Sequence, residues 1–398
     1  MNSNIRALIA IIFVNFVTIS GFGFMFPILA VYGKAIDANA TEIAFCVASF
    51  SLGQLIASPL WGRASDKYGR RNLLVGSLMV GAVIVALNAF AVTPWTLIFA
   101  RFVAGLAAGS FSIAFAVAAD ISTAENRTKI MGAVGAGFSL GFILGPAIGG
   151  FVAGSDPGPE AFARVCYAGA AMFFVGGLIT FFFLPETRKE EEPDETGEAP
   201  KQMSRSSVIK DPVIGVMLIL SLVSSIAMAK MEATFAIFAD DVLSLSPLGI
   251  GLFFAAMGGI GVIGQAGMAG ILSRKMGERG MLNLSLFFLF LGMALLALST
   301  EPVMAFIAMC TIAVGFSTNG PAMSGLTSLA APSNAQGVAL GLVQSSASLG
   351  RVVGPAMAGI IYDMGGPPAP FMVAAVILLV CFIGVFFWAR MTPAVQAN

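Results

Sequence analysis

The chain has 398 residues, 58% of them hydrophobic and only 11% charged, with a mean hydropathy of +0.91 and a formal net charge of zero. Soluble domains are about 25% charged, so this composition excludes a water-soluble protein of this length. Because the chain has no histidine, any proton transfer must use carboxylates.

Twelve apolar stretches follow one another along the sequence, and each approaches the length of about 20 residues that a helix needs to cross a bilayer. We therefore expect an all-α membrane protein with twelve transmembrane helices. The first stretch is too long for the apolar region of a secretory signal, and we expect it to remain as the first span. The predicted spans lie near residues 6–32, 43–61, 72–91, 95–119, 130–153, 163–184, 212–239, 248–272, 281–299, 302–328, 336–361 and 369–390.

One long polar stretch, residues 185–211, lies between the sixth and seventh predicted spans. Its acidic run from Glu190 to Glu198 is typical of a flexible, solvated linker, and a regulatory segment is the alternative. The stretch divides the chain into an N-terminal bundle of six helices (1–184), a cytoplasmic linker and a C-terminal bundle of six helices (212–398).

Lysine and arginine gather on one side of the predicted topology. With a cytoplasmic N-terminus, 16 of the 21 Lys and Arg residues lie in cytoplasmic segments, two (Lys34 and Arg164) on the far side and three within spans. Positive residues are retained on the cytoplasmic side of membrane proteins. We therefore expect both termini in the cytoplasm, and the inner (plasma) membrane of a bacterium as the location.

The two halves share sequence patterns at nearly one offset. At a shift of 208, residues 62–71 align with residues 270–279, and both segments follow an even-numbered span. At a shift of 209, residues 139–150 align with residues 348–359, on spans five and eleven. The coincidence indicates two six-helix repeats, and repeats that rock about a site at mid-membrane depth are the architecture of secondary transporters.

Three segments resemble signatures of the major facilitator superfamily. Residues 62–71 resemble its loop signature, which contains Ser/Ala-Asp, a basic residue, an aromatic residue and Gly-Arg-Arg. Residues 141–150 are similar to the fifth-helix Gly-x-x-x-Gly-Pro-x-x-Gly-Gly signature of proton-driven exporters, and residues 101–105 resemble the fourth-helix signature of the same proteins. The resemblance covers essentially the full chain and implies two pseudo-symmetric six-helix bundles with the activity of the twelve-helix drug:proton antiporters.

The loop between the second and third spans is predicted to gate the cytoplasmic side. Its glycines permit a tight reversal, and Asp66 lies near basic partners whose pairing latches the halves. Asp120, at the end of span four, is the best further acid to meet Arg70 or Arg71. The alternative is that the basic residues only anchor the orientation. The residues of this gating loop and its partner are Gly62, Asp66, Gly69, Arg70, Arg71 and Asp120.

The corresponding loop of the second half reverses both charges. It has Arg274 at the position of Asp66 and Glu278 at the position of Arg70. An ion pair of swapped polarity and a decayed copy both remain open at this point.

Small residues recur along span five. Its glycines repeat every four residues, which lets a neighbouring backbone approach closely, and Pro146 removes a backbone donor and adds a kink. The resemblance implies that this seam packs the two halves together on the outer side as a gate, and inert packing is the alternative. The seam residues, including the copy on span eleven, are Gly137, Gly141, Gly145, Pro146, Gly149, Gly354 and Pro355.

Four ionisable side chains lie within predicted spans, namely Arg101, Lys230, Glu232 and Arg351. Each costs about 2.5 to 3.5 kcal/mol at the centre of a span, so each is a candidate for proton coupling or substrate binding. Glu232 is the first candidate to bind a proton and a cationic or polar solute in turn; the alternative is that it lies near the outer surface, because Asp240 soon follows. Lys230 projects to roughly the opposite side of the helix from Glu232.

The two arginines differ in what the sequence says about them. Arg101 shares a helical face with Gly105 and Gly109, and we expect a role in proton coupling or solute binding, with hydrogen bonding to backbone carbonyls as the alternative. Arg351 stands where the first half has Phe142, so it departs from the repeat. The resemblance assigns it no role, but a charge so central needs a partner or a cavity.

The expected binding pocket is apolar and adaptable. Phenylalanine and methionine are abundant, with 34 and 21 copies, and both suit a weakly selective pocket. Exposure to lipid is the alternative for each of them. The expected lining residues are Phe22, Met25, Phe26, Met228 and Phe235.

These features predict a proton-coupled multidrug efflux antiporter of the cell membrane, and an exporter of a specific sugar, amino acid or lipid on the same fold is the second hypothesis. A receptor or an intramembrane enzyme is a remote third, since the spans hold no nucleophile–base set or metal ligands. We expect a monomer whose partners are a small-molecule substrate, protons and membrane lipids. No catalytic residue, cofactor, metal or nucleic acid is expected.

Overall fold

The computed structural model describes residues 3–122, 127–154, 159–187, 211–332 and 335–391, and every regular element within these ranges is a helix. The chain packs into two compact units, which are described separately below. Met1–Glu190 and Phe235–Gly258 form the first unit, and Glu191–Thr234 and Gly259–Asn398 form the second. Residues 235–258 thus pack with the N-terminal half, and the sequence-based boundaries at 184 and 212 stay a prediction.

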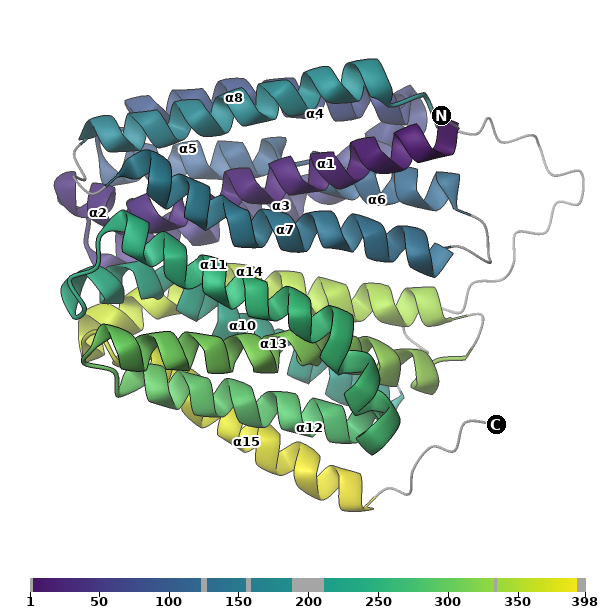
Figure 1. Cartoon of the computed structure of the whole chain (residues 1–398), viewed down its shortest axis with the longest axis vertical. Helices are drawn as coiled ribbons and strands as arrows, with labels where there is room; N and C mark the ends of the chain where they lie inside the picture. Colours follow the sequence, from purple (N-terminus) through teal and green to yellow (C-terminus); the bar gives the residue numbers. More distant parts are fainter. Residues whose placement is uncertain (1–2, 123–126, 155–158, 188–210, 333–334, 392–398) are drawn as a thin grey trace, which may run out of the picture. The chain divides into compact units, whose positions relative to one another are not determined.

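The first unit contains most of the N-terminal helices (Figure 1). In it α7 and α8 lie beside α1, while α5 lies beside α3. The end of α10 (Pro212–Asp241) and most of α11 (Pro247–Ile263) complete the unit. The other elements are α1 (Ser3–Gly23), α2 (Phe26–Ala35), α3 (Ala40–Tyr68), α4 (Arg70–Leu87), the 3-10 turn Asn88–Phe90, α5 (Pro94–Ala107), α6 (Ser110–Ile121), α7 (Arg127–Ala153) and α8 (Pro159–Phe183).

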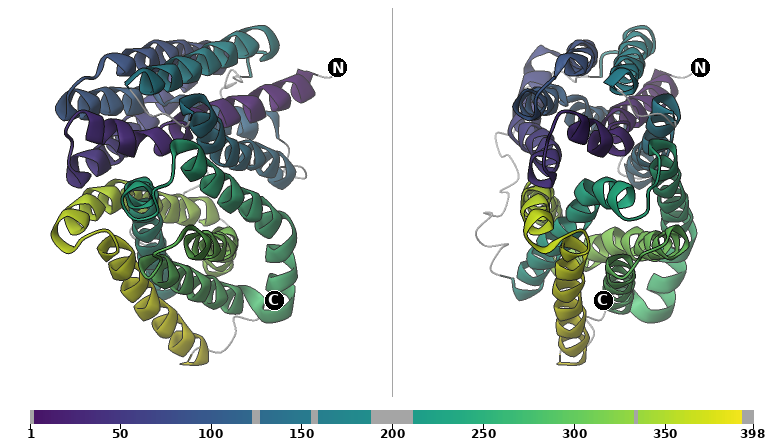
Figure 2. Two further views of the ribbon diagram at one scale, coloured as in Figure 1. Left: turned by 60° about the vertical axis from the view of Figure 1, so that its left-hand side comes forward. Right: turned by 90° about the vertical axis from the view of Figure 1, so that its left-hand side faces the viewer.

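The second unit contains the start of α10 and the remaining helices. In it α12 packs against both α13 and α15 (Figure 2). Gly277 interrupts α12 with a φ of 70°, which separates the predicted eighth and ninth spans. The elements are the π-helix Gly264–Met268, α12 (Ala269–Ala297), α13 (Pro302–Ala330), α14 (Gln336–Gly365) and α15 (Ala369–Met391).

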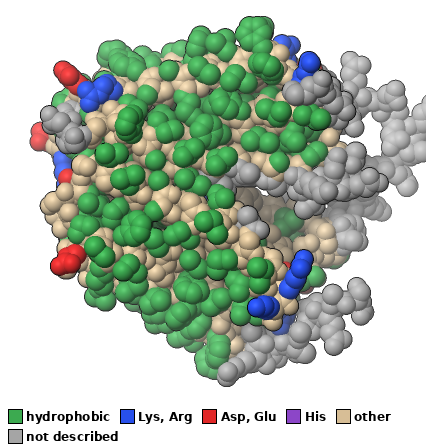
Figure 3. Space-filling view, viewed as in Figure 1, with side chains coloured by type: hydrophobic (Ala, Val, Ile, Leu, Met, Phe, Trp, Pro, Cys, Tyr) green, Lys and Arg blue, Asp and Glu red, His purple; other side chains and the backbone are tan. Residues whose placement is uncertain are grey.

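The described helices account for all twelve predicted spans. Nine helical segments are long and apolar enough to cross a membrane, and α7 and α11 contain the shorter apolar stretches Leu140–Ala153 and Pro247–Ile263. The remaining predicted span, the eleventh, corresponds to α14, which is 30 residues long. Phe151 and Phe182 are 76% and 72% exposed, and Figure 3 shows hydrophobic side chains over the face in view. Such exposure is unfavourable in water but favourable in lipid, so the predicted membrane fold is confirmed.

Two predicted spans are interrupted by short breaks. The first is divided into α1 and α2, and the fourth is divided into α5 and α6. At the second break Trp61 of α3 donates its indole N–H to the carbonyl of Leu106 at 2.8 Å. A Cβ on Gly109 would meet the Trp61 ring. Because a backbone carbonyl in lipid needs a protein partner, this indole stabilises the break.

In the first half, α1 and α7 approach each other closely. A Cβ built on Gly141 of α7 would lie 2.7 Å from the carbonyl oxygen of Phe16 and 3.1 Å from the amide nitrogen of Ser20. The Asn15 side chain donates to the carbonyl of Val134 at 3.3 Å. Glycine and a small polar side chain thus allow the two backbones to touch.

The second half repeats these contacts between α10 and α14. A Cβ on Gly350, which the sequence comparison aligned with Gly141, would lie 2.8 Å from the carbonyl oxygen of Leu222 and 3.1 Å from the amide nitrogen of Ile226. The hydroxyl of Ser221 donates to the carbonyl of Val343 at 2.9 Å. The same atoms meet at the same positions of the repeat, which supports the internal duplication.

We expect Gly350→Leu to destabilise the protein, because its side chain would overlap the α10 backbone. Overpacking of this kind costs about 1 to 3 kcal/mol. Gly341→Leu on the same helix is the control, since a Cβ there has nothing within 4 Å. Thermal unfolding of the purified protein in detergent should show a midpoint several degrees lower for Gly350→Leu alone. Equal midpoints for the two variants would contradict the close contact.

Candidate functional site

The turn from α3 to α4 depends on Gly69. Its φ of 95° lies in the left-handed region that favours glycine, and a Cβ there would lie 2.6 Å from Oε2 of Glu186. Gly62 was expected to help the reversal, but this is wrong because it lies inside α3 with open space around it. Gly69 alone therefore makes the turn, between the last residues of α3 and Arg70 at the start of α4.

Arg70 is the centre of a charge network. Its Nη1 lies 2.5 Å from Oδ1 of Asp66 and donates to the hydroxyl of Ser65 at 2.7 Å, and its Nε donates to Oδ2 of Asp120 at 3.0 Å. The predicted contact between Asp120 and Arg70 is therefore confirmed. The expectation that the pairing of Asp66 latches the two halves is wrong, because Asp66, Arg70 and Asp120 all belong to the first half. A planar guanidinium holds three partners at once, which a lysine cannot do in the same geometry, and here it links α3, α4 and α6.

Glu186, which follows α8, supplies the acceptors for the start of α4. Its carboxylate accepts from the backbone amides of Arg70 at 2.8 Å and of Arg71 at 3.2 Å. A negative charge at a helix N-terminus satisfies free amides and complements the helix dipole. The sequence interpretation placed Glu186 in the linker without a role. The signal was present, because Gly69 has no side chain to cap α4.

Arg71 points away from this network. Its guanidinium donates to the carbonyl of Phe181 and lies 5.0 Å from the centre of the Phe181 ring. Arg71 therefore ties α4 to the end of α8.

The second-half loop keeps the turn but not the ion pair. Gly277 has a φ of 70°, as Gly69 has 95°, and the hydroxyl of Ser273 donates to Oε1 of Glu278 at 2.6 Å. This contact repeats the one between Ser65 and Arg70 with opposite polarity. Within the part of the chain that the structure describes, Arg274 and Glu278 form no ion pair. The structure thus favours the decayed copy.

The seam glycines of α7 face α1 of the same half. A Cβ on Gly145 would lie 2.8 Å from Cα of Ser20, and one on Gly149 would lie 2.7 Å from Cα of Phe24. On α14, Gly354 approaches Ile226 of α10 in the same way, at 2.8 Å from its carbonyl oxygen. The expectation that these glycines join the two halves needs correction. They face α1 through Gly137, Gly141, Gly145 and Gly149.

Contact with the second half of the chain is made by the seam residue Pro146 and by Gly150, on a neighbouring face of α7. A Cβ on Gly251 of α11 would lie 2.6 Å from the carbonyl oxygen of Pro146, and one on Gly150 of α7 would lie 2.5 Å from that of Pro247. The expected contact between the halves is therefore confirmed at Pro146. These residues all belong to the first unit. Pro146 is buried in α7, as its repeat partner Pro355 is buried in α14.

A cluster of opposite charges lies where α2 and α10 end. The ammonium of Lys34 forms ion pairs with both Asp240 and Asp241, and each of these side chains is about a third exposed. At the start of α2, the rings of Phe26 and Phe254 stack with centroids 5.6 Å apart. The sequence interpretation used Lys34 only for topology, because nothing in one sequence shows which distant acid a lysine meets.

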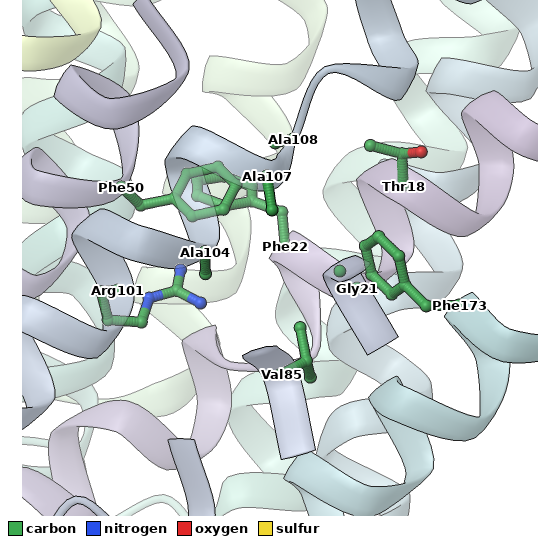
Figure 4. A pocket seen from close by; sticks show the side chains of 11 residues that line it. Thr18, Gly21, Phe22, Phe50, Val85, Arg101, Ala104, Ala107, Ala108 and Phe173 are labelled. Carbon is green, nitrogen blue, oxygen red and sulfur yellow. The ribbon is translucent and has the colours of Figure 1, made fainter. Parts of the chain in front are cut away.

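Arg101 of α5 is 2% exposed and borders a small cavity (Figure 4). Its Nε and Nη2 have no hydrogen-bond partner within the described residues. Instead the guanidinium lies 4.8 Å from the ring centre of Phe50 and 5.8 Å from that of Phe22. The free volume of about 10 Å³ has room for about one water molecule. The alternative role for Arg101, hydrogen bonding to backbone carbonyls, is not supported at these two nitrogens.

Three ionisable residues lie within spans of the second unit. Glu232 of α10 is partly buried, and its charge interacts with that of Arg351 on α14 without an ion pair within 4.0 Å among the described residues. Arg351 donates to the hydroxyl of Ser348 at 3.1 Å. Glu232 lies nine residues before the end of α10 at Asp241, about 14 Å at 1.5 Å per residue, and so not at the helix end. Lys230 is fully buried, and its Nζ has no partner in the described chain.

The five expected pocket residues separate into different surroundings. Phe22 borders the Arg101 cavity. Phe26 and Phe235 instead contact the ring of Phe254, with centroids 5.6 and 5.5 Å away. Met25 and Met228 are buried, at 2% and 3% exposure. Phe22 is thus the member of the set that lines the described cavity, together with Thr18, Gly21, Phe50, Gly81, Val85, Arg101, Ala104, Ala107, Ala108 and Phe173.

Sequence comparisons identify one family. The family described as Major Facilitator Superfamily matches residues 9–354 and, in a second match, residues 321–398. Multidrug resistance protein 2 of Bacillus subtilis (strain 168) is 28% identical, over 92% of this chain and 90% of that protein. Tetracycline resistance protein, class B, of Escherichia coli is 28% identical, over 87% of this chain and 86% of that protein.

The fold is also similar to that of solved transporters. One is a bacterial homologue of the human lysosomal transporter Spinster, in an inward-facing and occupied conformation. It has a TM-score of 0.85 and 12% identity, over 100% of this chain and 99% of that chain. At this identity the likeness concerns the fold alone.

We expect Glu186→Ala to loosen the start of α4, because the amides of Arg70 and Arg71 lose their acceptor. Hydrogen bonds to a charged group contribute about 1.5 to 3 kcal/mol, so hydrogen exchange in peptides from residues 69–73 should accelerate about 10- to 100-fold. Mass spectrometry measures this exchange. Glu160→Ala, an exposed acid in the first turn of α8, should leave it unchanged. Unaltered exchange in Glu186→Ala would remove the capping role.

Proposed function

The chain belongs to the major facilitator superfamily, and on that premise we propose that it exports hydrophobic or amphipathic small molecules in exchange for protons. It is a secondary transporter that exports drugs and not an enzyme, since the family match spans the chain and the relatives are named for multidrug and tetracycline resistance. Proton exchange is the further step, which the embedded charges support.

Glu232 carries the proposal of proton exchange. It is a carboxylate well inside a span, and histidine is absent from the chain. Arg351 is near enough for the two charges to interact, but the described side chains form no direct ion pair. A carboxylate that is not held in an ion pair is free to gain and lose a proton, and each change alters its attraction to Arg351. Arg101, buried and without hydrogen-bond partners at two nitrogens, is the second candidate.

Alternating access is supported by the Lys34 cluster, which joins residues of the two halves of the chain. The Arg70 network lies at the opposite end of helix α3 from this cluster. α3 has 29 residues and is therefore about 44 Å long. The Lys34 cluster lies near its start, and the network of Asp66, Arg70 and Asp120 lies at its end. We assign the Arg70 network to the cytoplasmic side and the Lys34 cluster to the outer side. The partners of Arg70 all belong to the first half of the chain, whereas Lys34 pairs with two acids of the second half. The Lys34 cluster must therefore loosen when the outer side opens.

The remaining assignments are part of the same proposal. Positive residues gather in the segments that this topology places in the cytoplasm, which favours cytoplasmic termini and a bacterial inner membrane. Exposed Phe and Leu side chains on the helices indicate contact with lipid. We propose a monomer, with the two bundles of the chain serving as the moving parts.

We expect Glu232→Gln to abolish transport driven by a proton gradient, because glutamine cannot exchange protons. Proteoliposomes containing the purified protein and a fluorescent drug measure this flux with and without an imposed pH difference. Glu301→Gln, an exposed acid that precedes α13 without a capping hydrogen bond, should keep full gradient-driven flux. Gradient-driven flux at the wild-type rate in Glu232→Gln would exclude this residue as the proton carrier.

We expect Lys34→Gln to let the outer end open more often, because Asp240 and Asp241 lose their shared cation. Partly exposed ion pairs contribute about 0.2 to 1 kcal/mol each, so loss of the two pairs should shift the equilibrium by up to about thirtyfold. Spin labels at Asp37 and Ser244, in a background without the four native cysteines, report the separation of these two loops. The charge swap Lys34→Asp with Asp240→Lys should restore much of the closed population.

The matched control is Arg164→Gln, which removes the other basic charge of that side. Arg164 donates to the carbonyl of Ala153 and lies outside the Lys34 cluster. A distance distribution that widens equally in both variants would show a general charge effect and would count against a latch.

A further inference from the structure

The embedded charges of this chain do not balance. Three are basic (Arg101, Lys230 and Arg351), and one is acidic (Glu232). Within the second unit the charges of Glu232 and Arg351 interact and offset each other. Arg101 and Lys230 are left with no acidic partner within hydrogen-bonding or ion-pair distance in the described residues.

Lys230 is the less compensated of the two cations. Its side chain has 0% exposure, and its Nζ makes no hydrogen bond within the described chain. It lies eleven residues before the end of α10, about 16 Å along the helix axis. A lysine side chain is too short to extend its ammonium to water over that distance. The ammonium therefore stays inside the apolar part of the protein.

Arg101 is partly compensated, but not by an acid. The ring faces of Phe50 and Phe22 lie 4.8 and 5.8 Å from its guanidinium, within the range of cation–π attraction. The residues that line its cavity include no Asp or Glu, and the hydroxyl of Thr18 already bonds Ser110 and Val14. The first unit thus contributes a second buried positive charge.

A buried charge without a partner is costly, and a ligand of opposite charge removes that cost. A ligand of the same charge is repelled, which is how a site rejects one class of compound in favour of another. An excess of buried cations therefore selects against the cationic solutes that Glu232 alone would suggest.

We propose that the transported substrates are amphipathic anions, with an acid group on an aromatic or aliphatic body, and that Lys230 binds the acid group. This inference rests on the proposed export function and names its substrate class. Glu232 keeps its role as the proton carrier, since it and Lys230 project to roughly opposite sides of α10.

Three probes with one pyrene body test the proposal: pyrenebutyrate, pyrenebutanol and pyrenebutyl-trimethylammonium. Equilibrium binding to the purified full chain in lipid nanodiscs, with empty nanodiscs subtracted, gives an affinity for each. We expect the carboxylate to bind at least tenfold more tightly than the quaternary ammonium. This comparison uses the wild-type protein and does not depend on how any variant folds. Equal or tighter binding of the cation, or no binding of the carboxylate, would overturn the proposal.

Variants then assign the acid group to Lys230. Lys230→Gln should lower carboxylate affinity to that of the alcohol without changing alcohol affinity, and Lys230→Arg should retain the preference. Lys275→Gln, which removes an exposed lysine of α12, should behave as wild type. Unchanged carboxylate affinity in Lys230→Gln would exclude Lys230 as the binding group.

The two proposals fail in different ways. Binding is measured without a gradient, so the charge preference is tested even if no proton-driven movement exists. If proteoliposomes move the cationic probe in response to a proton gradient and do not move the carboxylate, the export function stands and the anionic substrate class is wrong. If no probe is transported but the carboxylate binds more tightly than the cation, the proposal of proton-coupled export is wrong and the charge preference stands.

Discussion

The absence of water from the bilayer core is the constraint from which the described structure follows. Each backbone amide and carbonyl in a span needs a partner from the protein, which explains why every regular element in the described ranges is a helix. Where helices begin or break, side chains take over this task. Trp61 bonds the carbonyl of Leu106, and Glu186 accepts from the first amides of α4. The first contact lies at a break within a span and the second at the turn between two spans. They position α5, which carries Arg101, and the functional loop.

The same constraint explains how the helices associate. Lipid is as apolar as leucine, so burial of apolar surface does not hold membrane helices together, and close backbone contact through small residues does. Gly141 and Gly350 make this contact with equivalent atoms in the two halves. The two halves share the glycine contacts between their helices, but they differ in the charged residues of their loops. Glu278 stands at the position of Arg70, and among the described residues it accepts from Ser273 and forms no ion pair. Within these residues the ionic network is therefore found in the first half.

Composition and periodicity predicted the features of the fold that depend on the chemistry of neighbouring residues in the sequence. The twelve spans, the turn at Gly69 and the approach of Asp120 to Arg70 follow from apolar length, glycine conformation and the scarcity of acids at span ends. Partner choice over long distances was not predictable in this way. No pattern in the sequence pairs Lys34 with Asp240, or directs the glycines of span five toward α1 and not across the halves. Such pairings depend on how helices pack, which single residues do not encode.

Charges at the helix ends form direct ion pairs, whereas the charges inside the spans do not within the described residues, and this difference bears on function. At the ends, Lys34 and Arg70 each meet two carboxylates. Inside, Glu232 and Arg351 interact without direct contact, and Lys230 has no partner in the described chain. A tight ion pair inside a span would be neutral and insensitive to protons or ligands. The free energy of a charge without such a pair changes when a proton or an ion binds to it. If that change differs between two conformations of the protein, binding shifts the equilibrium between them.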